Sequence, residues 1–281
     1  MEIYGTTTAE VWLQACEHVA TKPRWEEHTL ILHVASPVRM RARDRAVAEK
    51  LDTFLREHDA LPNHTVAETI FPAYEYMHRG PEGVFTAYPE VLYPKLKKHP
   101  RRGWGRYAER LLRRKRADGT TWSPLEKTIE KLQSFRSRNT FDIAVAGGAA
   151  DLDDEDEGVT IALYDDNLDG MKPRQLPCLS HLSFHVLPGD RLHLTALYRS
   201  HYYVQRLYGN LLGLARLQDF VAQQAGKMTG ELVCHSTYAK LETCAEEARW
   251  KKADVQRLLQ DARRVFEEAS ANVGGVHQEA R

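Results

Sequence analysis

Apolar side chains recur every three to four residues in several parts of the chain, a spacing that places them on one face of a helix. The predicted helices cover 7–19, 44–55, 123–132, 208–225 and 245–270. Thr8 is the expected N-cap of the first. Ser123 is the expected N-cap of the third, because Pro124 and Glu126 follow at the first and third helical positions. The helix over 208–225 is apolar on most sides, which predicts burial on more than one face.

Runs rich in β-branched and aromatic residues predict strands between these helices. The predicted strands cover 28–34, 139–146, 159–164, 181–187, 191–198 and 231–237. The turn sequence Pro188-Gly189-Asp190 separates two of them and predicts an antiparallel hairpin. This mixture of elements predicts an α+β fold in which a mixed sheet packs on the long buried helix.

Length and local charge indicate how the chain is organised. Its 281 residues allow one large domain or two small ones, and a single domain over 1–281 is expected. Residues 150–158 form an acidic segment that is expected to be a solvated surface loop, because it lacks the Gly and Glu spacing of a calcium loop. The basic segment 95–116 predicts a solvated helix, with RNA contact as the alternative. Residues 271–281 are expected to fray.

Composition argues against several classes of protein. Lys+Arg and Asp+Glu are equal at 39 each, so a nucleic-acid partner is not expected. No apolar run reaches the ~20 residues that cross a bilayer, and no secretory signal is recognisable, so a cytoplasmic location is expected. The four cysteines lie far apart, which predicts no disulfide framework. His181, His185 and His193 form no clear metal triad, so no metal site is expected.

Three polar residues are candidates for chemistry. Cys178 precedes one predicted strand, Arg199 follows the next, and Asn210 opens the long helix. A thiol becomes nucleophilic when a nearby cation raises its thiolate fraction, and a guanidinium binds phosphate through two parallel hydrogen bonds. Each residue also has a structural interpretation, as a buried Cys, an ion-paired Arg and a helix N-cap. The residues alone leave both interpretations open.

The order of several motifs resembles the core of the thymidylate synthase and pyrimidine nucleotide hydroxymethylase superfamily. These motifs are Pro177-Cys178, Leu197-Tyr198-Arg199-Ser200, Gly209-Asn210, Ala222-Gln223-Gln224 and Gly230-Glu231. Fainter similarity extends upstream to 65–70, 104–111 and 137–139. The resemblance implies a thymidylate-synthase-like fold and a homodimer formed through the sheet.

The resemblance also implies roles for individual residues. Cys178 would add its thiolate to C6 of a uridine-type nucleotide, and Glu68 would assist proton transfers at the ring. Asn210 would read O4 and N3–H of the base, because one amide both donates and accepts. The expected ligands of the sugar and phosphate are Arg199, Ser200, Lys240 and, across the dimer interface, Arg138. His201 and Tyr202 stand where the cofactor, 5,10-methylenetetrahydrofolate, is expected.

Five positions depart from the family pattern. The family's Cys-Asp pair is replaced by His201-Tyr202, and a Gly is replaced by Arg206. The His and Tyr of the sugar-binding segment are replaced by Lys240 and Glu242. These changes affect the folate and sugar contacts and leave the nucleophile and the base-reading amide in place.

Two hypotheses of different classes follow. The first is a divergent pyrimidine-nucleotide C5 methyl- or hydroxymethyltransferase with a UMP- or dUMP-type substrate, in a setting such as modified-nucleoside metabolism. The second is a nucleotide-binding or interaction protein that keeps the fold without folate-dependent transfer. Arg206, Lys240 and Glu242 favour the second.

Overall fold

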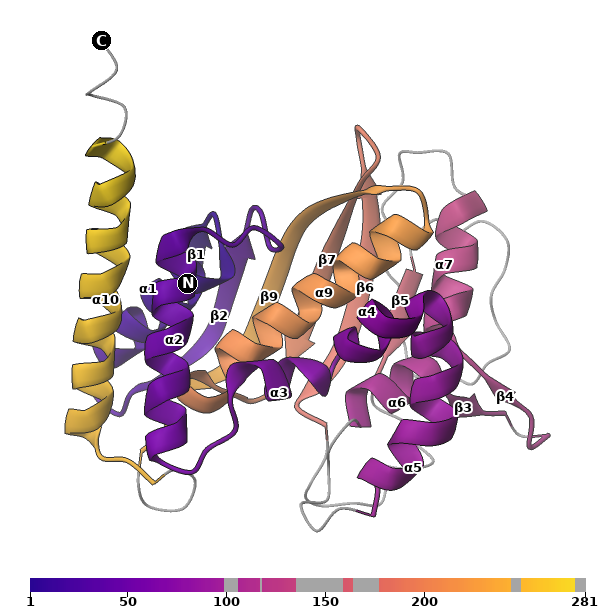
Figure 1. Cartoon of the computed structure of the whole chain (residues 1–281), viewed down its shortest axis with the longest axis horizontal. Helices are drawn as coiled ribbons and strands as arrows, with labels where there is room; N and C mark the ends of the chain where they lie inside the picture. Colours follow the sequence, from indigo (N-terminus) through magenta and orange to yellow (C-terminus); the bar gives the residue numbers. More distant parts are fainter. Residues whose placement is uncertain (99–105, 117, 135–158, 164–176, 244–248, 276–281) are drawn as a thin grey trace.

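The computed structural model describes residues 1–98, 106–116, 118–134, 159–163, 177–243 and 249–275. A mixed sheet of seven strands, with helices packed on it, is the centre of this part of the chain (Figure 1). The strand order is β1-β2-β9-β7-β6-β5, and β8 pairs with β9 off this path. The strands are β1 (Glu2–Gly5), β2 (Glu26–Val34), β5 (Val159–Ala162), β6 (Leu179–Leu187), β7 (Arg191–Tyr198), β8 (His201–Tyr202) and β9 (Met228–Lys240).

Strand β9 organises the sheet. It pairs antiparallel with β2 and parallel with both β7 and β8. Strand β1 is parallel to β2, whereas β6 is antiparallel to β7 and to β5. The predicted hairpin is confirmed, with Leu187 opposite Arg191. Its turn places Gly189 and Asp190 at φ values of 84° and 53°, a left-handed backbone that Gly and Asp adopt more readily than most residues.

The helices gather in two groups around a central one. Helices α2 and α10 lie side by side at the β1 end of the sheet, and α4 to α7 lie at the β5 end (Figure 1). The helices are α1 (Thr8–Ala20), α2 (Ala42–Glu57), α3 (Asn63–Glu68), α4 (Ala73–Glu82), α5 (Tyr93–Leu96), α6 (Arg106–Leu112), α7 (Pro124–Ser134), α9 (Tyr208–Gln224) and α10 (Lys252–Gly275). Two π-helical segments are η1 (Gly83–Leu92) and η2 (Tyr203–Leu207), and a separate ribbon joins β3 (Arg114–Lys115) and β4 (Thr121–Trp122).

Helix α9 is buried between the sheet and α3. It packs on β9 and β7 (Figure 1), and α3 crosses its other face at two glycines. A Cβ atom at Gly209 would lie 2.6 Å from the Cβ of Val66, and one at Gly213 would lie 2.8 Å from the carbonyl oxygen of Ala67. Both distances are shorter than packed atoms tolerate, so the glycines permit the close approach. The predicted burial on more than one face is confirmed.

Of the two predicted helix N-caps, the first is wrong by one residue and the second is confirmed. Thr7, and not Thr8, caps α1, because the Thr7 hydroxyl accepts a hydrogen bond from the Glu10 amide at 3.4 Å. Thr8 is already inside the helix and buried. The Ser123 cap of α7 is confirmed, since its hydroxyl accepts from the Glu126 amide at 3.2 Å.

Element bounds differ from the predictions mainly near the C-terminus. Strand β9 is longer than the predicted 231–237, and α10 begins at Lys252 instead of near 245. Helix α10 continues to Gly275, within the segment expected to fray. The predicted strand over 139–146 and the acidic segment 150–158 lie outside the described residues. The observed architecture is α+β with a mixed sheet and a buried helix; its thymidylate-synthase-like character and the dimer stay predictions.

Candidate active site

Cys178 lies half-buried just before β6, and α6 fixes its backbone. The Tyr107 hydroxyl oxygen accepts hydrogen bonds from the amides of Cys178 and Leu179 at 3.1 and 3.3 Å. The Cys178 carbonyl accepts from the Arg199 amide at 3.0 Å. These contacts join the start of β6 to the end of β7 and to α6, so the thiol stands on a fixed stretch of backbone.

Two guanidinium groups act on the Cys178 thiol. Burial raises the pKa of Cys178, while the positive charges of Arg199 and Arg206 oppose that rise. Arg199 is exposed, and its Nε donates to the Pro177 carbonyl at 2.9 Å. Because burial outweighs the two cations, the thiol form dominates near neutral pH. A nucleophilic role would therefore require that a bound substrate or a proton acceptor shift this balance.

Arg206 lies in η2, and the buried carboxylate of Glu242 anchors that segment. Glu242 is 0% exposed and accepts hydrogen bonds from the amides of Val204 and Gln205 at 3.2 and 2.7 Å. Burial raises the pKa of Glu242 to about 7, against these backbone donors. Burial also lowers the pKa of Arg206, opposed by Tyr107, Glu242 and Cys178. The charge of Arg206 thus interacts with both Glu242 and Cys178.

His201 and Asn210 form a buried polar network with β9. The Asn210 amide nitrogen lies 2.9 Å from His201 Nε2, and His201 Nδ1 lies 3.0 Å from the Ser236 hydroxyl oxygen. The Tyr203 hydroxyl donates to the same Ser236 oxygen at 3.2 Å. Burial lowers the pKa of His201 to about 3, so the ring is neutral at physiological pH. The ring also stacks on Tyr198, with centroids 4.0 Å apart and planes 10° from parallel.

The position of His201 does not fit a folate contact. The residue is 2% exposed, both ring nitrogens have partners, and one ring face is covered by Tyr198. Tyr202 is half-buried in β8 and pairs in register with Lys240 of β9. The burial of His201 therefore conflicts with the expectation that this residue binds the cofactor.

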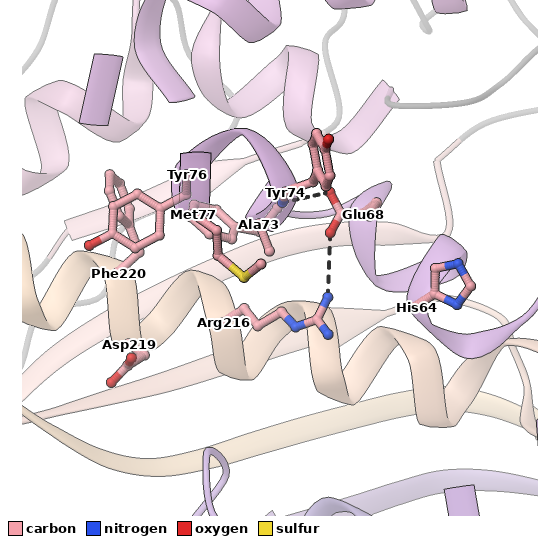
Figure 2. A pocket seen from close by; sticks show the side chains of 10 residues that line it. His64, Glu68, Ala73, Tyr74, Tyr76, Met77, Arg216, Asp219 and Phe220 are labelled. Carbon is pink, nitrogen blue, oxygen red and sulfur yellow. Dashed lines mark hydrogen bonds and ion pairs between the residues drawn. The ribbon is translucent and has the colours of Figure 1, made fainter. Parts of the chain in front are cut away.

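Glu68 lies at the end of α3, in an open pocket of about 300 Å³ (Figure 2). Its carboxylate is 3.5 Å from the Arg216 guanidinium and accepts a hydrogen bond from the Tyr74 amide at 3.4 Å. Burial raises the pKa of Glu68, while Arg216 and His64 oppose the rise. Figure 2 shows Glu68 directed toward Arg216 of α9.

Backbone contacts relate the Glu68 pocket to the nucleophile. The Thr69 carbonyl accepts from the Ala108 amide at 3.1 Å, and Tyr107, the preceding residue of α6, holds Cys178. The Glu68 carboxylate contacts Arg216 and the Tyr74 amide, both of which belong to the pocket, and within the described residues it makes no hydrogen bond to Cys178. Its role in proton transfer stays a prediction.

The remaining predicted ligands lie at different places. Ser200 is half-buried in the link between β7 and β8. Lys240 ends β9, with its Nζ atom 3.7 Å from a carboxylate oxygen of Glu26 on β2. Arg138 lies outside the described residues. The structure thus groups Cys178 with Arg199 and leaves Lys240 on the β2 side of the sheet.

Tyr198 connects the two parts of the site. Its ring stacks on His201, and its fully buried hydroxyl has no hydrogen-bond partner among the residues that the structure describes. Burial raises the pKa of Tyr198 well above its usual value, and the nearby Tyr107 and Cys178 add to the rise. Cys178, Tyr198, His201 and Asn210 therefore form a continuous sequence of neighbours from β6 to the start of α9.

Two contributors to this site were not identified from the sequence. Tyr107 lies in the basic segment 95–116 and in the range 104–111 of faint family similarity, and its hydroxyl holds the Cys178 backbone. Glu242 was noted only as a departure from the sugar-binding pattern, yet it anchors η2. The local sequence gives no signal for either contact, since the partners lie 71 and 37 residues away.

Within the described residues, no cluster of three or more His, Cys, Asp or Glu side chains is arranged to hold a metal ion. The same part of the chain contains no helix with the length and apolarity needed to cross a membrane.

Known proteins give a partial match. The chain is 34% identical over 87 residues to a protein of Methanothermobacter marburgensis named putative thymidylate synthase, which covers 31% of this chain and 38% of the relative. It is 35% identical over 80 residues to a protein of the same name from Methanothermobacter thermautotrophicus, covering 28% of this chain and 34% of the relative. The chain thus spans little more than a third of these relatives' length, and no protein-family model matches it. Over that part of its length, the chain is similar to proteins that carry the name putative thymidylate synthase.

Proposed function

We propose that the protein is a pyrimidine-nucleotide C5 transferase in which the Cys178 thiolate adds to C6 of a uridine-type nucleotide. The observation that carries this proposal is the half-buried Cys178 thiol, with its backbone fixed by Tyr107 and with the charges of Arg199 and Arg206 opposing the rise in its pKa that burial causes. The partial similarity to proteins named putative thymidylate synthase supports the same class of chemistry.

The addition makes an unreactive carbon nucleophilic. When sulfur bonds to C6, the C5–C6 π electrons move toward C5 and O4, and C5 can attack a one-carbon electrophile. Loss of the C5 proton followed by departure of sulfur from C6 restores the aromatic ring and the thiolate. Arg199, which is exposed beside Cys178, would bind the phosphate, and its positive charge would partly offset the rise that burial causes in the pKa of the thiol. Ser200 would contact the same phosphate.

Methylation and hydroxymethylation both start from this adduct, but methylation from a formaldehyde-level donor also requires a hydride, which a reduced folate donor would have to supply, whereas hydroxymethylation requires water. The resemblance implies 5,10-methylenetetrahydrofolate as donor, but the burial of His201 does not match that expectation. The donor is therefore tested separately from the addition step. Exchange of the C5 hydrogen with solvent requires only the nucleotide and the thiolate, since C5 gains one proton and loses another.

The first experiment measures that exchange. UMP and dUMP carrying tritium at C5 are incubated with the wild type, Cys178→Ala and the control Cys234→Ala, whose thiol is fully buried in β9. We expect tritium release with the wild type and the control and a fall to background with Cys178→Ala. Absence of Cys178-dependent release from either nucleotide would refute the addition mechanism.

A second function is a nucleotide-binding protein without transfer. The raised pKa of Cys178 and the inaccessible His201 favour it. Calorimetry distinguishes the two, because a binding protein would hold the nucleotide equally well in the wild type and in Cys178→Ala and would be indifferent to methylenetetrahydrofolate. Nucleotide-dependent tritium release excludes this alternative.

A homodimer through the sheet belongs to the same proposal. Side chains on β9 alternate between buried and half-buried positions, so the sheet face away from α9 retains accessible side chains. Arg138 of a second copy would then reach the phosphate. Light scattering of the wild type measures the mass, and Arg138→Gln should weaken nucleotide binding without changing that mass.

A further inference from the structure

The Asn210 amide can distinguish uracil from cytosine only if its orientation is fixed. Uracil presents an acceptor at O4 and a donor at N3, whereas cytosine presents a donor at N4 and an acceptor at N3. A side-chain amide that rotates by 180° exchanges its oxygen and its nitrogen and so fits either edge. Selectivity for one base therefore requires a partner that accepts only one orientation of the amide.

His201 has the properties of such a partner. The Asn210 nitrogen faces His201 Nε2 at 2.9 Å, so Nε2 must be the acceptor and carry no proton. The proton of the neutral ring is then on Nδ1, which donates to the Ser236 hydroxyl oxygen at 3.0 Å. Stacking on Tyr198 at 4.0 Å fixes the plane of the ring. If the amide were reversed, its oxygen would face the lone pair of Nε2.

Two features keep the ring in this tautomer. Ser236 is 0% exposed, and the Tyr203 hydroxyl donates to the same Ser236 oxygen at 3.2 Å. Burial lowers the pKa of His201 to about 3, so protonation does not convert Nε2 into a donor at physiological pH. The network therefore sets a single direction of hydrogen bonding from Asn210 to Ser236.

We propose that His201 is a positioning residue that fixes the Asn210 amide, so that Asn210 presents its carbonyl oxygen and its second N–H to a uracil-type base. This inference rests on the proposed function, because it assumes that a pyrimidine binds at Asn210. It assigns His201 the role of orienting the Asn210 amide instead of contacting the cofactor.

The ligand-free protein gives the first test. Nitrogen-15 NMR of the wild type labelled at His reports which ring nitrogen is protonated. We expect the His201 signal to show Nδ1 protonated and Nε2 unprotonated, without titration between pH 5 and 8. Signals that show Nε2 protonated would overturn the inference whether or not a nucleotide binds.

Base selectivity gives the second test. We expect wild type to bind dUMP more tightly than dCMP, and His201→Leu to reduce this preference about tenfold, the effect of one lost directed hydrogen bond. His201→Gln should restore most of the preference, because its amide offers one acceptor and one donor in place of the ring. Tyr203→Phe is the milder variant, removing only the hydroxyl that donates to Ser236.

The outcomes separate this inference from the proposed function. If tritium is released from dUMP in a Cys178-dependent way but the dUMP preference is the same in His201→Leu as in the wild type, His201 has no positioning role and the proposed function stands. If His201→Leu does not fold, Tyr203→Phe and the NMR signals decide. If the wild type neither binds nor exchanges any pyrimidine nucleotide, the proposed function is refuted, and this inference with it.

Discussion

His201 and Glu242 are two buried titratable side chains that join the segment from β8 to α9 to the rest of the fold, and burial shifts their pKa values in opposite directions. The pKa of His201 falls to about 3, and that of Glu242 rises to about 7. Both changes favour the neutral side chain, because a charge loses its hydration in the protein interior. The pair shows that a single physical cause gives opposite responses to pH.

The two contributions to stability have opposite signs. The folded pKa of His201 lies below its usual 6.5, so its contribution is complete above pH 6.5 and is lost as the pH falls toward 3. The folded pKa of Glu242 lies above its usual 4.5, so its contribution is complete below pH 4.5 and is lost as the pH rises through about 7. Between pH 4.5 and 6.5 the increase in stability due to His201 nearly cancels the decrease due to Glu242, so the free energy of unfolding of the wild type changes little with pH.

Removing one group should reveal the other. In Glu242→Gln, the free energy of unfolding should increase by about 2 kcal/mol as the pH rises from 4.5 to 6.5, because only the pH dependence of His201 remains. That of the wild type should stay nearly constant over the same range. In His201→Gln it should fall by about 2 kcal/mol over the same range. Urea unfolding at the two pH values measures both. Identical pH profiles for the wild type and both variants would contradict the opposed shifts.

Tyr107 is an anchor that stays uncharged over the pH range in which His201 and Glu242 differ, and Tyr107→Phe extends the comparison to it. Tyr107 accepts two backbone hydrogen bonds, as Glu242 does, but burial raises its pKa further above the acidic range. The variant should lose about 1–2 kcal/mol of stability at both pH 4.5 and pH 6.5, because two amides lose their acceptor. Urea unfolding with Tyr74→Phe, at an exposed ring, as a control checks this, and a loss confined to one pH would show that the anchor is coupled to a titrating group.

The Glu68 and Arg216 pair should give the smallest effect. Both side chains are partly exposed, at 32% and 38%, and their charged atoms are 3.5 Å apart. Glu68→Gln should change the free energy of unfolding by less than about 1 kcal/mol, and salt should reduce the difference further. A double-mutant cycle with Arg216→Gln isolates the pair. A coupling as large as the effects expected at Glu242 would mean that the pocket is less solvated than its exposure indicates.

Much of the fold could be predicted from the sequence, because its signals are local. The β6–β7 hairpin follows from Pro188-Gly189-Asp190, and the start of α7 follows from Ser123 and Pro124. Strand β1 and the π-helical segments were not predicted. The first is only four residues long and is stabilised by pairing with β2, and the others have no distinctive local pattern.

The candidate site was predictable only in part, for a related reason. Cys178 and Arg199 are joined through a backbone hydrogen bond in the structure, as the proximity of the two motifs suggested. The burial of His201 could not be read from its neighbours, because it depends on Tyr198 above the ring and on Ser236, which is 35 residues away. The sequence identified the positions that depart from the pattern of the family it resembles. The contacts that their side chains make depend on packing between distant segments.

The two glycines where α3 crosses α9 have a consequence for how this protein can diverge. Asn210 lies directly after Gly209, so any side chain added there would push α3 outward or move the first turn of α9. The amide that we propose reads the base is thereby tied to a close helix contact that involves no ligand atom. A change at this crossing would require compensating substitutions in both helices.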